Sequence, residues 1–177
     1  MLSRLPESIN GVELWYLVSM AERQSGYPVE FGYLNKIVQL PAATDEQIAV
    51  VEARFGELPA DYRWFLKTVN GGRPSRTFID VPGWSFDIEC FNGLGGDPTS
   101  SYAVERRSSW ASEILERQVV AIAGNGAGDQ LIFLSAGDPA VYQWIHDEEV
   151  PPVRMASSFT DLLWLLRDRS ASEGDAC

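Results

Sequence analysis

Three short apolar segments in the second half of the chain, residues 118–123, 130–135 and 140–146, place the strongest constraint on the fold. They are joined by residues 124–129 and 136–139, which are rich in the turn formers Gly, Asn, Asp and Pro. A parallel crossover needs about a dozen residues or more, so connections this short allow only antiparallel pairing. The sequence therefore predicts an antiparallel meander.

Two helices with marked ends precede these segments. Thr44 and Gln47 form a capping box, in which a hydroxyl and an amide three residues later satisfy backbone N–H groups at the start of a helix that ends at Gly56. A second helix begins at Pro59, because a missing N–H costs nothing in the first turn. It ends at residues 70–72, Asn-Gly-Gly, which tolerate a left-handed backbone. The sequence predicts a helical pair with a tight corner.

After the helical pair the hydrophobic period changes to two. Residues 77–81 are a predicted strand, and residues 84–90 alternate apolar with polar side chains. This second pattern predicts one half-buried strand with an acidic outer face that carries Asp87 and Glu89. The Gly-rich residues 92–98 predict a mobile loop.

The remaining segments complete an α+β domain. Residues 104–117 are ambiguous, because Ser108-Ser109 weaken an otherwise helical pattern. A strand over residues 153–156 leads into a final helix that Ser158 caps and that buries an apolar face over residues 159–166. We expect a mainly antiparallel meander flanked by an N-terminal helical pair and a C-terminal helix.

The chain divides into three parts by composition. Residues 1–36 are a predicted helical extension with a helix from Asn10 to Gln24, residues 37–169 the α+β domain, and residues 170–177 a flexible tail. The N-terminus does not resemble a secretory signal, and no apolar run approaches the roughly 20 residues of a membrane span. We therefore expect a cytoplasmic protein.

The charge of the chain restricts its partners. The formal net charge is −11 at pH 7. A negative surface of this size repels phosphate backbones and anionic membranes, and attracts a basic protein. The sequence predicts a protein partner of basic character, with no nucleic acid and no membrane.

Few residues indicate a catalytic, cofactor-binding or metal-binding site. The glycine-rich residues 124–129 lead into a strand rather than a helix, so they predict a turn and not a phosphate-binding loop. His146, the only histidine, precedes three carboxylates, but neighbours on a strand point to opposite faces, so we expect a polar strand end that runs into a solvated acidic turn. Cys90 is a predicted buried residue and Cys177 a free tail thiol. We predict no catalytic residue, no cofactor and no metal site.

Binding residues are easier to nominate. The aromatic side chains are mostly predicted core, but Trp64 and Trp164 fall off the apolar stripes of their helices and could be exposed interface anchors. Acidic side chains in the sheet half could form a face complementary to a basic partner. The candidate contacts are Asp87, Glu89, Asp97, Asp147, Glu148, Glu149 and Trp64.

Four of these segments, in this order, carry a family resemblance. Residues 44–55, 58–72, 122–129 and 157–163 together resemble the SUKH superfamily, which is named for a yeast cell-wall synthesis regulator and its bacterial relatives. The resemblance covers Ile37 to Leu166. It implies an α+β domain without enzymatic activity; bacterial members act as immunity proteins against polymorphic toxins, often nucleases or deaminases, and eukaryotic members as signalling modules.

Three functional hypotheses follow. The first is a bacterial, cytoplasmic immunity protein that occludes its toxin with the acidic face. The second is an enzyme or small-ligand binder that uses a groove between helices and sheet, with His146 and Asp129 as the reactive pair; it requires these side chains to meet within hydrogen-bond reach in a concave pocket. The third is a regulatory scaffold without a toxin.

Overall fold

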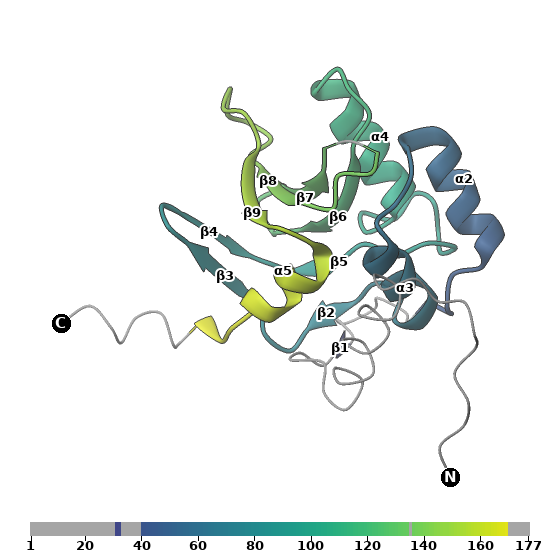
Figure 1. The fold of residues 1–177 in the computed structure, drawn as a ribbon, viewed down its shortest axis with the longest axis horizontal. Helices are drawn as coiled ribbons and strands as arrows, with labels where there is room; N and C mark the ends of the chain where they lie inside the picture. The colour runs from purple at the N-terminus through teal and green to yellow at the C-terminus, as the bar shows by residue number, and fades with distance from the viewer. Residues whose placement is uncertain (1–30, 33–39, 135, 170–177) are drawn as a thin grey trace, which may run out of the picture.

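A five-stranded antiparallel sheet forms the centre of the fold (Figure 1). The computed structural model describes residues 31–32, 40–134 and 136–169. The strands lie in the order β5-β6-β7-β8-β9, and each pairs antiparallel with its neighbour. Their bounds are β5 Cys90–Phe91, β6 Val120–Gly124, β7 Gln130–Phe133, β8 Val141–Trp144 and β9 Val153–Ala156. The predicted meander is confirmed.

Helices cover both faces of this sheet. One face packs against α2 (Asp45–Phe55), α3 (Ala60–Thr68) and α5 (Phe159–Leu165), and the other against α4 (Val104–Ile114) (Figure 1). Side chains that alternate along β6 and β7 supply the two cores, since neighbouring residues of a strand point to opposite faces. The described fold is α+β, as the sequence predicts.

Stacked aromatic rings fill the larger core. Tyr62 and Phe65 of α3 both contact Phe159 of α5, with ring centroids 5.0 and 4.9 Å apart, and Phe65 also lies 5.5 Å from Phe91 of β5. All four residues are at most 1 % exposed. Tilted and edge-on ring pairs at these distances stabilise a core beyond the area that they bury. Two helices distant in sequence are thus fixed to the sheet.

The caps that the sequence marks are present. The Thr44 hydroxyl accepts a hydrogen bond from the Gln47 N–H, and the Gln47 side chain accepts one from the Thr44 N–H. The Ser158 hydroxyl accepts from the Asp161 N–H at the start of α5. The ambiguous segment is helical as α4, because the Ser108 hydroxyl, buried under the helix, accepts the Ala121 N–H at 3.0 Å.

The predicted single strand over residues 84–90 is wrong. β4 (Trp84–Asp87) pairs with β3 (Phe78–Val81) in a separate hairpin, whereas β5 joins the central sheet. The chain changes sheets between them: the Ile88 N–H donates to Thr77 O, and the Glu89 N–H donates to Gly124 O. The burial still alternates because both sheets cover one core, so the periodicity could not reveal the break.

The predicted mobile loop over residues 92–98 is also partly wrong. Asn92, Gly93 and Leu94 are buried, and the Asn92 amide donates to Ala121 O at 3.0 Å. Its glycines and polar residues serve close packing there, and exposure begins at Gly95. The predicted helix over residues 10–24, the extension over residues 1–36 and the tail over residues 170–177 lie outside the described residues, except for Phe31–Gly32 of β1.

The junction after α3 joins the helices to the sheet. Asn70, Gly71 and Gly72 all have positive φ, at 58°, 95° and 105°. The chain turns there toward β2 (Arg73–Pro74), which pairs with β1, and Gly72 exchanges two backbone hydrogen bonds with Phe91 of β5. The buried Asn70 amide donates to Pro41 O at 2.6 Å and Leu94 O at 2.8 Å, and its oxygen accepts the Leu94 N–H at 2.8 Å.

We expect Asn70→Gly to lower the free energy of unfolding by about 2–4 kcal/mol, measured by urea denaturation. Glycine keeps the left-handed backbone but leaves the buried groups of Leu94 without their partner, which costs more than a hydrogen bond between exposed groups. The exposed Ser85→Ala is the control and should stay within about 0.5 kcal/mol of the wild type. Equal stability of the two variants would contradict a structural role for the Asn70 side chain.

Candidate functional site

The candidate acidic residues do not form one uninterrupted face. Asp87 forms an ion pair with Arg169, with 2.9 Å between carboxylate and guanidinium. Glu89 is partly buried at the strand break, and Asp97 is exposed but accepts hydrogen bonds from the backbone N–H and the hydroxyl of Thr99. These hydrogen bonds keep the pKa of Asp97 below its ordinary value. Three of the six acidic candidates therefore have local structural contacts.

The other three are consecutive, and we call them the acidic turn: Asp147, Glu148 and Glu149. They follow β8 and precede β9, and all three are exposed. Within the described part of the chain, none of them lies within ion-pair distance of a lysine or arginine; the imidazole of His146 lies 4.0 Å from Asp147. The acidic turn is thus an uncompensated negative segment.

The two tryptophans flagged by the sequence differ in exposure. Trp164 on α5 is 50 % exposed, whereas Trp64 on α3 is partly buried. The two helices contact each other. As an interface anchor Trp64 therefore offers only part of its indole, and Trp164 offers more.

The structure brings His146 and Asp129 together. The imidazole Nδ1 lies 3.1 Å from Asp129 Oδ1, and the same oxygen accepts the His146 backbone N–H at 3.3 Å. The topology explains the contact: in a meander alternate turns lie at the same end of the sheet, so the β6–β7 turn meets the β8–β9 connection. The first condition of the enzyme hypothesis, convergence of the two side chains, is met.

The β6–β7 turn is built to hold Asp129 in place. The side-chain oxygen of Asn125 accepts the N–H groups of Ala127, Gly128 and Asp129, and its amide donates to Asp129 Oδ2 at 2.9 Å. Partial burial alone would raise the pKa of Asp129, but the hydrogen bonds from Asn125 and His146 outweigh burial and lower it. The carboxylate is therefore ionised at neutral pH.

The imidazole of His146 packs between a glycine and a tryptophan. Gly128 has φ +109°, and a Cβ there would lie 3.0 Å from the imidazole Cε1. On α4, the Trp110 ring lies 5.7 Å from the imidazole and 5.0 Å from Trp144. The His146 side chain is 30 % exposed, because the turn and α4 cover the rest, and the residues that follow it form the exposed acidic turn that the sequence predicts.

Asp147 also approaches this pair, against the sequence expectation that adjacent residues diverge. Single ligand atoms of Asp129, His146 and Asp147 all lie within 4.8 Å of one another. The alternation rule applies inside a strand, and β8 ends at Trp144, so residues 146 and 147 already belong to the connection. Which strand residue is the last cannot be read from the periodicity.

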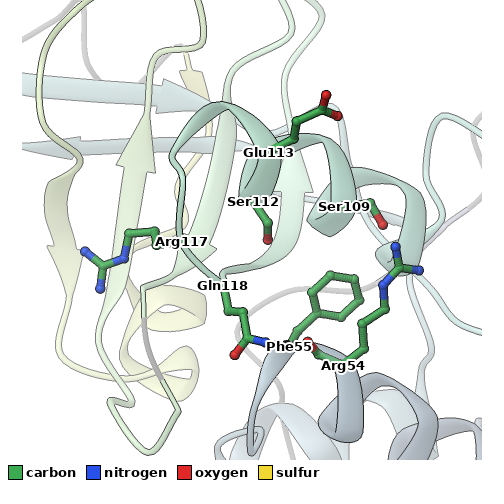
Figure 2. A pocket seen from close by; sticks show the side chains of 7 residues that line it. All are labelled: Arg54, Phe55, Ser109, Ser112, Glu113, Arg117 and Gln118. Atoms are coloured by element: carbon green, nitrogen blue, oxygen red, sulfur yellow. Dashed lines mark hydrogen bonds between the residues drawn. The ribbon is translucent and has the colours of Figure 1, made fainter.

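A groove lies elsewhere, between the end of α2 and α4 (Figure 2). It has a volume of about 420 Å³. Figure 2 shows Arg54, Phe55 and Gln118 on one side and the α4 side chains opposite. The Gln118 amide donates to Arg54 O at 3.0 Å, and the Arg54 guanidinium lies over the Phe55 ring. The lining residues are Arg54, Phe55, Ser109, Ser112, Glu113, Arg117 and Gln118.

Neither His146 nor Asp129 lines this groove. The second condition of the enzyme hypothesis, a concave pocket around the pair, is therefore not met by it. The groove itself presents arginines, hydroxyls, a carboxylate and an amide, but its two hydroxyls bond to backbone groups, Ser109 to Glu105 and Ser112 to Val119, and not to a base. The sequence did not predict the groove or the Trp110 contact, because residues 104–117 were ambiguous. The i, i+3 spacing of Arg107 and Trp110 could have indicated a helix there, and in the structure the Arg107 guanidinium lies over the Trp110 ring at 5.6 Å.

Cys90 is not a nucleophile in this fold. It is 0 % exposed, and burial raises the pKa of its thiol to about 11. A buried thiol of that pKa is almost entirely protonated at neutral pH, whereas the thiolate is the reactive form. Cys177 lies outside the described residues.

A protein-family model matches most of the described chain. The model of the SMI1 / KNR4 family (SUKH-1) matches residues 42–164, which is more than half of the chain. No curated protein matches the chain. The matched region begins before α2 and ends within α5, so it contains the helical pair, α4 and the whole central sheet. No helix in the described residues is long and apolar enough to cross a membrane.

We expect Asp129→Asn to lower the free energy of unfolding at pH 7 by about 1–3 kcal/mol, because a charged acceptor of several hydrogen bonds is replaced by a neutral one. The folded-state pKa of Asp129 is lowered, so this stabilisation is present above the unfolded pKa of about 3.9 and is lost as pH falls through the folded value. Urea denaturation at several pH values should show the two proteins converging in acid. A constant difference down to pH 2 would contradict the assignment, and the exposed Glu148→Gln is the control.

We expect Cys90 to resist thiol reagents in the native state. In a Cys177→Ser background, Ellman's reagent at pH 8 should label the native protein far more slowly than the denatured protein, since Cys90 is buried and only about a thousandth of it is thiolate at any moment. Complete labelling should appear in denaturant. Rapid stoichiometric labelling without denaturant would show that Cys90 is accessible and acidic.

Proposed function

The chain belongs to the SMI1/KNR4 family (SUKH-1), and from this premise we propose that it is a non-enzymatic protein-binding module that acts as an immunity protein. In this role it neutralises a polymorphic bacterial toxin, a nuclease or deaminase, by binding it directly in the cytoplasm. Toxin immunity is compatible with the family. The observation that carries the proposal is the position of the acidic turn on the family scaffold: three exposed carboxylates that have no lysine or arginine partner among the residues that the structure describes.

Charge complementarity supports a basic toxin. The net charge of −11 attracts a cationic protein over long range, and enzymes that bind phosphate backbones present cationic surfaces. Steering of this kind raises the association rate more than the final affinity. An inhibitor that must reach its toxin before damage occurs gains directly from a faster encounter.

The remaining candidates have secondary roles in this proposal. Asp97 lies in an exposed loop and adds to the negative field, while Asp87 is partly neutralised by Arg169 and Glu89 is partly buried. Val150, which is 36 % exposed, directly follows the acidic turn and offers apolar area at its edge. Trp64 contributes the part of its ring that the fold leaves accessible. The contact surface is therefore centred on residues 147–150.

One observation favours an enzymatic alternative, namely the contact of 3.1 Å between His146 and Asp129. In general acid–base catalysis, a carboxylate can orient the histidine that transfers the proton. The described groove lies away from the pair, and the aromatic contact with Trp110 gives the imidazole a packing role. The alternative predicts that His146→Gln abolishes biological function, whereas the immunity proposal predicts that protection survives it.

The decisive experiment is co-expression. The toxin encoded beside the gene for this chain is expressed in a bacterial host, with and without the full chain. Protection of growth, together with a stable complex of the two purified proteins, is the expected result. A chain that neither binds this toxin nor protects against it would overturn the immunity role, and would favour a regulatory scaffold without a toxin.

We expect neutralisation of the acidic turn, by Asp147→Asn, Glu148→Gln and Glu149→Gln together, to slow association with that toxin by about tenfold at low salt. The matched control neutralises three exposed carboxylates elsewhere, Glu57, Glu113 and Glu116, and changes the net charge equally. Surface plasmon resonance at several salt concentrations should show a flatter salt dependence for the first variant than for the control. Identical rates for the two variants would exclude the acidic turn as the steering site.

A further inference from the structure

The cluster of Asp129, His146 and Asp147 has the composition of a metal-binding site. It contains one imidazole and two carboxylates from two connections of the meander, the β6–β7 turn and the start of the β8–β9 connection. Imidazole nitrogen and carboxylate oxygen are preferred ligands of Zn²⁺ and of similar first-row transition metals. Mg²⁺ and Ca²⁺ instead take oxygen ligands throughout. The donor set therefore selects a divalent transition metal.

The distances between the donor atoms fit a single ion. His146 Nδ1 lies 3.1 Å from Asp129 Oδ1 and 4.0 Å from Asp147 Oδ1, and all three ligand atoms lie within 4.8 Å of one another. Ligands at 2.0–2.2 Å from a tetrahedral ion are about 3.4 Å apart. Only the exposed side chain of Asp147 must move, by a rotation that the surface permits.

Neighbouring residues hold two of the three ligands in position. Asn125 binds the outer oxygen of Asp129 at 2.9 Å and leaves Oδ1 directed at the imidazole. Gly128 supplies the space in which the ring lies, since a Cβ there would be 3.0 Å from it, and Trp110 covers the ring from α4. Partners that orient ligands in this way are characteristic of metal sites and strengthen binding by about 10–100-fold.

We propose that Asp129, His146 and Asp147 form a binding site for a divalent transition metal of the Zn²⁺ type, with water completing the coordination. The site is open on the side of Asp147, whose side chain is 72 % exposed, so water can occupy the remaining positions. A bound ion ties the acidic turn to the β6–β7 turn and offsets the negative charges of Asp129 and Asp147, one from each connection. The site shares Asp147 with the acidic turn, but metal binding by these three side chains does not require the immunity role.

Titration of the full chain with Co²⁺ tests the proposal, in a Cys177→Ser background that removes the tail thiol. One equivalent of Co²⁺ should produce a visible d–d absorption that Zn²⁺ abolishes by competition. Absence of saturable binding up to millimolar Co²⁺ at pH 7.5 would overturn the proposal.

Two variants separate the site from general attraction by negative charge. Asp147→Asn leaves the Asp129–His146 hydrogen bond in place and should raise the Kd for Co²⁺ at least tenfold. Glu148→Gln removes the same charge from the next residue and should leave the Kd within about twofold. Equal effects of the two changes would indicate a diffuse counterion and refute the site.

The single histidine of the chain allows a direct readout. In a ¹H–¹⁵N spectrum of the imidazole, one equivalent of Zn²⁺ should shift Nδ1 more than Nε2, because Nδ1 faces the carboxylates. A dominant shift at Nε2, or none, would contradict the assigned geometry. His146→Gln should abolish the cobalt absorption, and its folding is checked by circular dichroism.

Discussion

The junction at Asn70, Gly71 and Gly72 is the constraint on which the rest of the structure depends. Three successive residues with positive φ turn the chain out of α3 and into contact with β5. The approach is so close that a Cβ on Gly93 would lie 2.6 Å from Asn70 O, and one on Gly71 would lie 3.1 Å from Phe91 O. The absence of a side chain at Gly71 and Gly93 permits this approach, and Asn70 closes the junction by bonding both Pro41 and Leu94. The helical pair and the central sheet then share one aromatic core.

The features that could be predicted from the sequence depend on interactions between residues close together in the chain. The Thr44 capping box, the Asn-Gly-Gly helix end and the short connections of the meander each act within a few residues, and each is confirmed. The strand break at Ile88 and Glu89 was missed because their N–H groups donate to Thr77 and Gly124. Hydrophobic periodicity indicates which side chains are buried, but not which carbonyl a backbone N–H binds. The helix α4 was ambiguous because its serines act through a long-range bond to Ala121.

For the His146–Asp129 contact, the sequence identified the two residues but not the distance between them. The register of β7 and β8 pairs Gln130 with Trp144, so the residues just before 130 must lie beside those just after 144. The strand lengths that set this register were predicted only approximately, and a shift of one residue would have turned the imidazole to the other face. The two side chains were nominated from their chemistry, whereas their distance depends on a pairing that periodicity does not determine.

The topology of the meander brings the polar and charged side chains of two connections together at one end of the sheet. Alternate connections of antiparallel strands lie together, so the β6–β7 turn and the acidic turn are neighbours whatever their sequences. The core and the Asn70 junction hold the strands without help from either turn, since the described aromatic contacts come from α3, α5 and the sheet. Substitutions in the exposed residues 147–150 can therefore change charge, ligands and partner contacts at little cost in folding. A scaffold organised in this way suits a binding protein whose specificity must change while its fold persists.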